Sequence, residues 1–219
     1  WHGTAASAVD LNPSGYAGSV ASGVLGDNIV GTASLAGNND QHATLWTGPS
    51  HSRTDLHPVG FPSSGAFGIS ADSQVGTGFL TFYFSGDRHA LLWHGTAASA
   101  VDLNPTGFTR SEAYSVAGTT QVGYGMGPST GDQNHAFLWQ GTAGSAVDLH
   151  ALLAGLPQSF VSSEAHGIDA NGVIVGFAMT INLVPFAVKW TPVPEPSTAV
   201  LSLIGLAMIG GRRCRNRCF

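Results

Sequence analysis

Short apolar runs separated by turn residues fill most of residues 1–190. One cycle contains the runs His89–Trp93, Ala100–Leu103, Glu112–Val116 and Gln121–Tyr124, with Gly, Pro, Asn, Ser and Thr between them. Runs of this length with β-branched and aromatic side chains predict β-strands, and the residues between them predict tight turns. Side chains alternate along a strand, and neither face of the first run is polar. Such a strand is typical of a sheet covered on both faces.

The runs recur as an internal repeat. The fullest copy extends from His89 to Asn104, and residues 135–149 and, more loosely, 42–56 repeat it. Tryptophans at positions 1, 46, 93, 139 and 190 are 45, 47, 46 and 51 residues apart. Four short strands in each copy of about 45 residues are typical of a propeller blade. The sequence therefore predicts an all-β domain over residues 1–190, a β-propeller-like array of four four-stranded blades.

Small residues occupy three positions of every copy. We expect the alanines to stay small where blades converge on an axis. We expect the glycine that ends the fourth run to mark a bulge or a close backbone approach. The positions are Ala43, Ala90, Ala136 and Ala187, then Ala21, Ala66, Ala113 and Ala165, and then Gly31, Gly76, Gly123 and Gly176.

The two ends of the repeat domain are incomplete in complementary ways. Trp1 begins a copy that lacks its first run, and residues 185–190 supply a first run that nothing follows. One interpretation pairs residues 185–190 with residues 5–11 and closes a ring, which removes two exposed sheet edges. The other is that upstream blades are missing. The chain starts without a Met or a leader, so we interpret it as a fragment truncated at its N-terminus.

Beyond residue 190 the composition changes. Residues 191–198 form a Pro-rich linker, residues 199–211 are almost wholly apolar, and residues 212–219 form a basic tail. The apolar segment predicts a short transmembrane helix, although the 15 residues from 197 to 211 fall below the roughly 20 of a full span. Basic residues after such a helix remain in the cytoplasm and leave the repeats outside. These membrane-stop residues are Arg212, Arg213, Arg215 and Arg217.

Charge argues against a nucleic-acid partner. The whole chain has a net charge of −5, but residues 1–196 carry four basic and 13 acidic groups, a net −9. Phosphate binding requires clustered Lys and Arg, which the repeats lack. Both cysteines, Cys214 and Cys218, lie in the tail and fall short of a zinc site. The sequence predicts no disulfide framework, no metal site and no cofactor.

The C-terminal segment resembles a PEP-CTERM sorting signal. The motif Pro194-Glu195-Pro196, a short apolar helix and an Arg-rich end follow one another within residues 193–219. The resemblance implies that exosortase, a membrane protease-transpeptidase, recognises residues 194–196 and removes the helix with its arginines. It also implies a Gram-negative host and a protein tethered to the membrane before processing. Its final place would be the cell surface or the extracellular matrix of a biofilm.

The repeats resemble the HAF family of bacterial extracellular repeats. The family is named after the sequence that occurs here as His135-Ala136-Phe137. Thr44, Leu91 and Phe186 depart from that pattern. The resemblance implies an extracellular setting and defines no activity.

A histidine, a tryptophan and an aspartate recur in the copies, either as a ring of ligands or as structural braces. Catalysis requires one asymmetric constellation, whereas these positions repeat equivalently, and Phe186 replaces the histidine in the last copy. Buried polar groups must be hydrogen-bonded, so we interpret these residues as braces within each blade. The positions are His42, His89 and His135, then Trp46, Trp93, Trp139 and Trp190, and then Asp10, Asp55, Asp102 and Asp148.

Function is expected where the copies differ most. The segment 79–84 is unusually aromatic, and Phe79, Phe82, Tyr83 and Phe84 are candidates for stacking on sugar rings. An extended outer strand is the alternative interpretation of this segment.

The leading hypothesis from the sequence is an exported, non-enzymatic surface or matrix protein that binds extracellular polysaccharide or a cell-surface protein. The first alternative is a secreted polysaccharide lyase or glycoside hydrolase on a propeller scaffold. It predicts a single funnel where Glu112, Glu164 or a histidine from non-equivalent positions converge. The second alternative is a passive spacer without a specific ligand.

Overall fold

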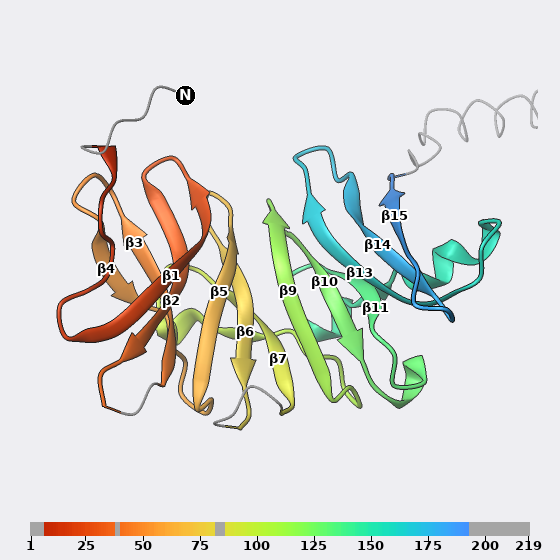
Figure 1. The fold of residues 1–219 in the computed structure, drawn as a ribbon, viewed down its shortest axis with the longest axis horizontal. Helices are drawn as coiled ribbons and strands as arrows, with labels where there is room; N and C mark the ends of the chain where they lie inside the picture. The colour runs from red at the N-terminus through yellow and green to blue at the C-terminus, as the bar shows by residue number, and fades with distance from the viewer. Residues whose placement is uncertain (1–6, 38–39, 82–85, 193–219) are drawn as a thin grey trace, which may run out of the picture.

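The computed structural model describes residues 7–37, 40–81 and 86–192, and in this part of the chain most regular structure is β-strand (Figure 1). The strands are β1 (Tyr16–Leu25), β2 (Asn28–Leu35), β3 (Gln41–Thr47), β4 (Ser52–Asp55), β5 (Ser63–Ile69), β6 (Gln74–Phe79), β7 (Arg88–Trp93), β8 (Val101–Asp102), β9 (Arg110–Ala117), β10 (Thr120–Met126), β11 (His135–Trp139), β12 (Val147–Asp148), β13 (Phe160–Ile168), β14 (Ile174–Thr180) and β15 (Pro185–Trp190). Short 3-10 helices are η2 (Ala97–Ser99), η3 (Pro128–Thr130), η4 (Ala143–Ser145) and η5 (His150–Gly155).

The strands form four consecutive antiparallel meanders, which we number sheets 1 to 4. Sheet 1 contains β1–β4, sheet 2 contains β5–β8, sheet 3 contains β9–β12 and sheet 4 contains β13–β15. Sheets 2 and 3 are also joined at their edges by one parallel pair, Arg88 and Arg110. The all-β prediction is therefore confirmed.

Each sheet packs one face on the next sheet, and the core lies in the three junctions between them. In every junction a fully buried valine of one sheet shares a cluster with a fully buried alanine of the next. The pairs are Val30 and Ala66, Val75 and Ala113, and Val122 and Ala165. Sheets 2 and 3 are covered on both faces, which explains why neither face of the run at 89–93 is polar.

The sheets are offset from the sequence copies by two strands. Sheet 3, for example, combines β9 and β10 with β11 and β12, so it joins the last two runs of one copy to the first two runs of the next. Every sheet thus ties neighbouring copies together by backbone hydrogen bonds. Sheet 4 has only three strands within the described residues, so the prediction of four four-stranded blades is wrong there.

The repeated glycine faces a β-bulge on the neighbouring strand. The innermost strand of each sheet has a register shift opposite or next to this glycine. A Cβ on Gly123 would overlap the carbonyl oxygen of Glu112, and Gly31, Gly76 and Gly176 have equivalent neighbours. The glycines therefore permit the close backbone approach that the sequence predicted.

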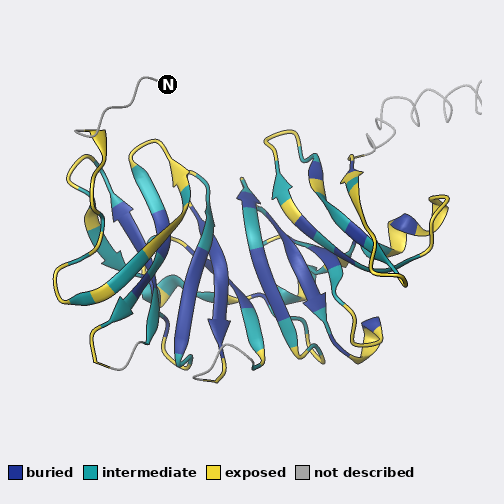
Figure 2. Ribbon diagram, in the orientation of Figure 1, coloured by how far each residue is buried: buried dark blue, intermediate teal, exposed yellow. Residues whose placement is uncertain are grey.

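The array is an open fan, and ring closure through residues 5–11 and 185–190 is not observed. Val9 and Asp10 belong to no sheet, and β15 pairs only with β14 among the described residues. Sheets 1 and 4 lie at opposite ends of the fan, because each packs on a single neighbour (Figure 1). Buried residues are concentrated in the middle strands and give way to exposed ones at both ends (Figure 2).

The predicted linker, transmembrane helix and basic tail lie almost wholly outside the described residues, which end at residue 192. Within the described part, no helix has the length and apolar character needed to cross a bilayer.

Candidate functional site

A histidine and an aspartate are hydrogen-bonded in each of the first three sheets. The pairs join the third strand to the fourth and are His42–Asp55 at 2.9 Å, His89–Asp102 at 2.6 Å and His135–Asp148 at 2.8 Å, each from Nδ1 to Oδ2. The second carboxylate oxygen accepts the backbone N–H two residues later, and Asp10 does the same. The pair therefore fixes the short outer strand in place.

A serine hydroxyl connects each sheet to the next. Ser64, Ser111 and Ser163 accept the backbone N–H of an alanine in the preceding sheet, at 3.0, 2.9 and 3.0 Å. All three serines are buried. Our sequence analysis missed them, although a recurrent Ser-x-Ala at 64–66, 111–113 and 163–165 marks them.

A second histidine stacks on the first in sheets 1 and 3. The ring centroids are 3.9 Å apart for His42 and His57, and 4.0 Å apart for His135 and His150. Nδ1 of the second histidine lies 2.8 or 2.9 Å from the linking serine hydroxyl. In sheet 2 Asn104 takes this place and accepts a 2.7 Å hydrogen bond from the serine hydroxyl.

Protonation of these groups is controlled by their surroundings. Burial raises the pKa of Asp55 and Asp148, but hydrogen bonds from the histidine and from the backbone outweigh it and leave the pKa of both carboxyls below the ordinary value. Burial, followed by the nearby charge of the first histidine, lowers the pKa of His57 and His150.

The tryptophans act mainly through packing. Trp46, Trp93 and Trp139 are almost fully buried, and their indole N–H groups have no hydrogen-bond partner within the described residues. Trp190 differs, because its N–H donates to the carbonyl of Leu149 at 3.0 Å. Buried N–H groups normally have a hydrogen-bond partner. Among the four described tryptophans, only Trp190 has one, so the predicted hydrogen-bonding role of the indole is observed in one copy of four.

Glu112 and Glu164 also connect sheets. Glu112 pairs with Nε of Arg88 at 2.7 Å and accepts the Tyr124 hydroxyl at 2.7 Å. Glu164 accepts the Asn134 amide at 2.8 Å and lies 3.1 Å from Nε2 of His166. Each carboxylate therefore has two side-chain partners in the structure. Besides burial, the negative charge of Glu164 raises the pKa of Glu112, so the two carboxylates lie within electrostatic range of each other.

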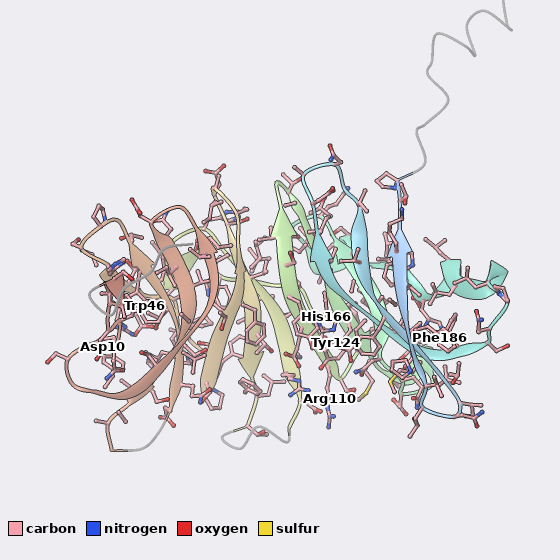
Figure 3. All side chains as sticks on the ribbon, turned by 45° about the horizontal axis from the view of Figure 1, so that its top comes forward. Asp10, Trp46, Arg110, Tyr124, His166 and Phe186 are labelled. Carbon is pink, nitrogen blue, oxygen red and sulfur yellow. The ribbon has the colours of Figure 1, made fainter. Side chains whose placement is uncertain are left out.

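Residues on the bulges form a row beside these carboxylates. Phe67, Tyr114 and His166 lie on successive inner strands; the first two ring centroids are 6.1 Å apart, and Tyr114 stacks on His166 at 4.6 Å. Tyr114 also contacts Tyr124, with ring centroids 5.9 Å apart (Figure 3 labels Tyr124 and His166). Burial raises the pKa of Glu112 despite Arg88, and burial followed by Glu112 raises the pKa of Tyr114 and Tyr124. Both phenols therefore stay protonated at neutral pH.

A groove of about 390 Å³ opens at one rim, between sheets 2 and 3. Its lining combines the β5–β6 and β9–β10 turns with the loops after Trp93 and Trp139. Leu92 lies against the groove, and Asp72, His94, Thr119 and Gln140 are exposed around it. These four residues are far apart in the sequence, and nothing in the linear order brings residues 72, 94, 119 and 140 together.

Of the four aromatic residues predicted to stack on sugar rings, the structure describes only Phe79. Phe79 ends β6 with only 8% of its surface exposed, so it packs in the interior. Phe82, Tyr83 and Phe84 lie outside the described residues, as do the sorting residues Pro194, Glu195 and Pro196 and the arginines at 212, 213, 215 and 217. Among the described residues no three His, Cys, Asp or Glu side chains are grouped to hold a metal ion.

Residues 192–216 match the family model of the PEP-CTERM protein-sorting motif. The C-terminal segment is similar to this sorting signal. A protein with this signal is exported and is processed at the membrane by exosortase in Gram-negative bacteria. The matched segment includes the predicted motif residues 194–196 and three of the four arginines, Arg212, Arg213 and Arg215.

No curated protein matches the chain. Among solved structures, TolB from Acinetobacter baumannii is similar, with a TM-score of 0.46 and 12% sequence identity. The similarity covers 77% of this chain and 42% of TolB, so the chain spans less than half the length of that protein.

Proposed function

We propose that this exported protein is a non-enzymatic component of the cell surface or extracellular matrix and that it binds polysaccharide there. The sorting motif at residues 192–216 is the observation that carries the proposal, because it directs the chain to the outside of the cell. We further propose that the repeats are of the HAF type and that the fan of sheets is propeller-like. The polar residues of the repeats support a binding rather than a catalytic role, since their side chains brace the sheets.

The groove between sheets 2 and 3 is the proposed binding site. Its volume of about 390 Å³ lies within the roughly 300–1,000 Å³ of small-molecule sites, which suits one or two sugar units of a longer polymer. The Asp72 carboxylate, the Thr119 hydroxyl and the Gln140 amide offer acceptors and donors for sugar hydroxyl groups. The groove is open along one side, as a polymer requires.

Equilibrium binding to extracellular polysaccharide purified from the source organism tests this proposal. The double substitution Asp72→Ala and Gln140→Ala removes two polar contacts of about 1 kcal/mol each, so we expect at least roughly tenfold weaker binding. Asp27→Ala is the matched control, because Asp27 is exposed in the corresponding turn of sheet 1. Undetectable binding by the unmodified protein, or equal losses in both variants, would contradict the proposal.

The alternative is a polysaccharide lyase or glycoside hydrolase that uses Glu112 and Glu164. The same samples distinguish the two, because an enzyme releases new reducing or unsaturated ends over time. We expect no release by the unmodified protein. Release that Glu164→Gln abolishes would favour the enzyme instead.

A further inference from the structure

The two end faces of the fan repeat the surfaces that pack together inside it. Val30, Val75 and Val122 are fully buried by the next sheet, whereas the equivalent Val175 of sheet 4 is 50% exposed. On sheet 1 the exposed face is the one turned away from the next sheet. Val24 is 68% exposed although its counterpart Val116 is 6% exposed in the junction between sheets 2 and 3.

The small residues at the two ends follow the same rule. Ala66, Ala113 and Ala165 are fully buried on the inner strands, but the equivalent Ala21 is exposed. Ala43, Ala90 and Ala136 are fully buried on the third strands, but the equivalent Ala187 is exposed. Sheet 1 therefore presents the face that a preceding sheet covers, and sheet 4 presents the face that a following sheet covers.

A segment outside the sheets, residues 8–13, accompanies these faces. Residues 1–13 are identical in sequence to residues 93–105, which include the outer strand β8 of sheet 2. The turn after Asp10 has already formed, since the Asn12 N–H donates to Asp10 Oδ1 at 2.9 Å, as Asn104 does to Asp102 at 2.8 Å. Val9 is nonetheless 64% exposed, and Leu11 is only partly buried where Leu56, Leu103 and Leu149 are buried.

Among residues 7–192 that the structure describes, no strand pairs with the outer edge of β15 in sheet 4. In sheet 3, β11 pairs with β12 through Leu138 and Val147 and through Phe137 and Asp148. By the same register Lys189 would face Val9, and Val188 would face Asp10. Asp10 would gain no imidazole, because Phe186 stands at the histidine position. The strand addition would therefore rest on backbone hydrogen bonds and apolar packing.

We infer that the chain associates head to tail with a second copy of itself. Sheet 4 of one copy packs on sheet 1 of the other, and residues 8–11 of the second copy extend the edge of β15. A second copy is required because Asp10 and Phe186 lie at opposite ends of the molecule (Figure 3). The contact is heterologous, so two such contacts close a dimer and further copies extend a filament.

Cysteine cross-linking of the full chain in detergent tests this inference. The background carries Cys214→Ser and Cys218→Ser, and Val24→Cys and Val175→Cys are placed in separate chains. Both side chains are exposed, so the substitutions leave the core intact. We expect the mixture of the two variants to form at least about tenfold more linked dimer than either variant alone. Val59→Cys mixed with Val175→Cys is the control, because Val59 is fully exposed in the loop between β4 and β5 that joins sheets 1 and 2.

Three results would overturn the inference. The first is equal linkage in the test and control mixtures. The second is a dimer formed by Val24→Cys alone, which indicates like faces in contact. The third is a single chain carrying both cysteines that links only to itself, which indicates ring closure. Separately, Val175→Glu should weaken association at least about tenfold by sedimentation, whereas Val147→Glu, at a site 48% exposed on β12, should leave it unchanged.

Discussion

The repeated histidines and aspartates connect strands within a sheet, and the serines connect one sheet to the next. The pair of residues His135 and Asp148 ties the outer strand to β11, and Ser163 ties sheet 3 to sheet 4. His150 completes this group by stacking on His135 and contacting Ser163. Protonation of the second histidine therefore opposes the packing of two sheets.

We expect the free energy of unfolding to decrease when the pH falls from 7 to 5. The pKa of His57 and His150 is lowered in the folded state, so below the ordinary value of 6.5 the unfolded chain binds protons that the folded chain does not. Stability is present above pH 6.5 and is lost as the pH falls towards the folded pKa. The lowered pKa of Asp55 and Asp148 adds a loss of the same sign below about pH 4.

Urea denaturation at several pH values measures this dependence. The control variant carries His57→Asn and His150→Asn, because Asn104 occupies the same position in sheet 2 and accepts from its serine. The variant should lose most of the dependence between pH 7 and 5. If the free energy of unfolding of the variant depends on pH as before, other titratable groups cause the dependence.

At the scale of residues, the sequence was sufficient to predict which positions share a role, but not which side chains they contact. Equal spacing of His89 and Asp102 in each copy indicated a shared role, which only the pairing of β7 and β8 defines. Phe79 was a candidate for ligand contact because the copies differ most around it, but it is buried at the end of β6. The groove at residues 72, 94, 119 and 140 depends on four loops that meet only in three dimensions.

At the scale of the strands, the repeated glycine and the bulge opposite it define the inner edge of each sheet. Gly123 has no space for a side chain because the Glu112 carbonyl lies against it. The bulge also directs Tyr114 and His166 out of the strand and into contact with one another. The glycine pattern predicted the close approach but not the side chains that the bulge directs.

We expect Gly123→Ala to destabilise the protein by about 2–3 kcal/mol, because the added methyl group forces two strands apart. Gly144→Ala is the matched control, since a Cβ there has open space around it. Thermal or urea denaturation of both variants provides the comparison. Equal stability of the two would show that β9 and β10 adjust without cost.

At the scale of the whole molecule, the period of the tryptophans predicted stacked sheets, and the structure contains them. The period could not define where each sheet begins, because one cycle of runs can be grouped into sheets from any starting run. It also could not decide closure, which depends on how far each sheet rotates relative to the last. The exposed Val24 and Val175 show that both end faces remain uncovered in one copy.

Export and processing at residues 192–216 are the centre of this account, and the mass of the mature protein tests them most directly. Intact-mass spectrometry of the protein from surface and matrix fractions of the source bacterium should show a chain that has lost its apolar helix and arginines. In cells without exosortase, the membrane fraction should contain the chain with its apolar segment and arginines still attached. If cells that contain exosortase release protein with the apolar segment and arginines still attached, the account is contradicted.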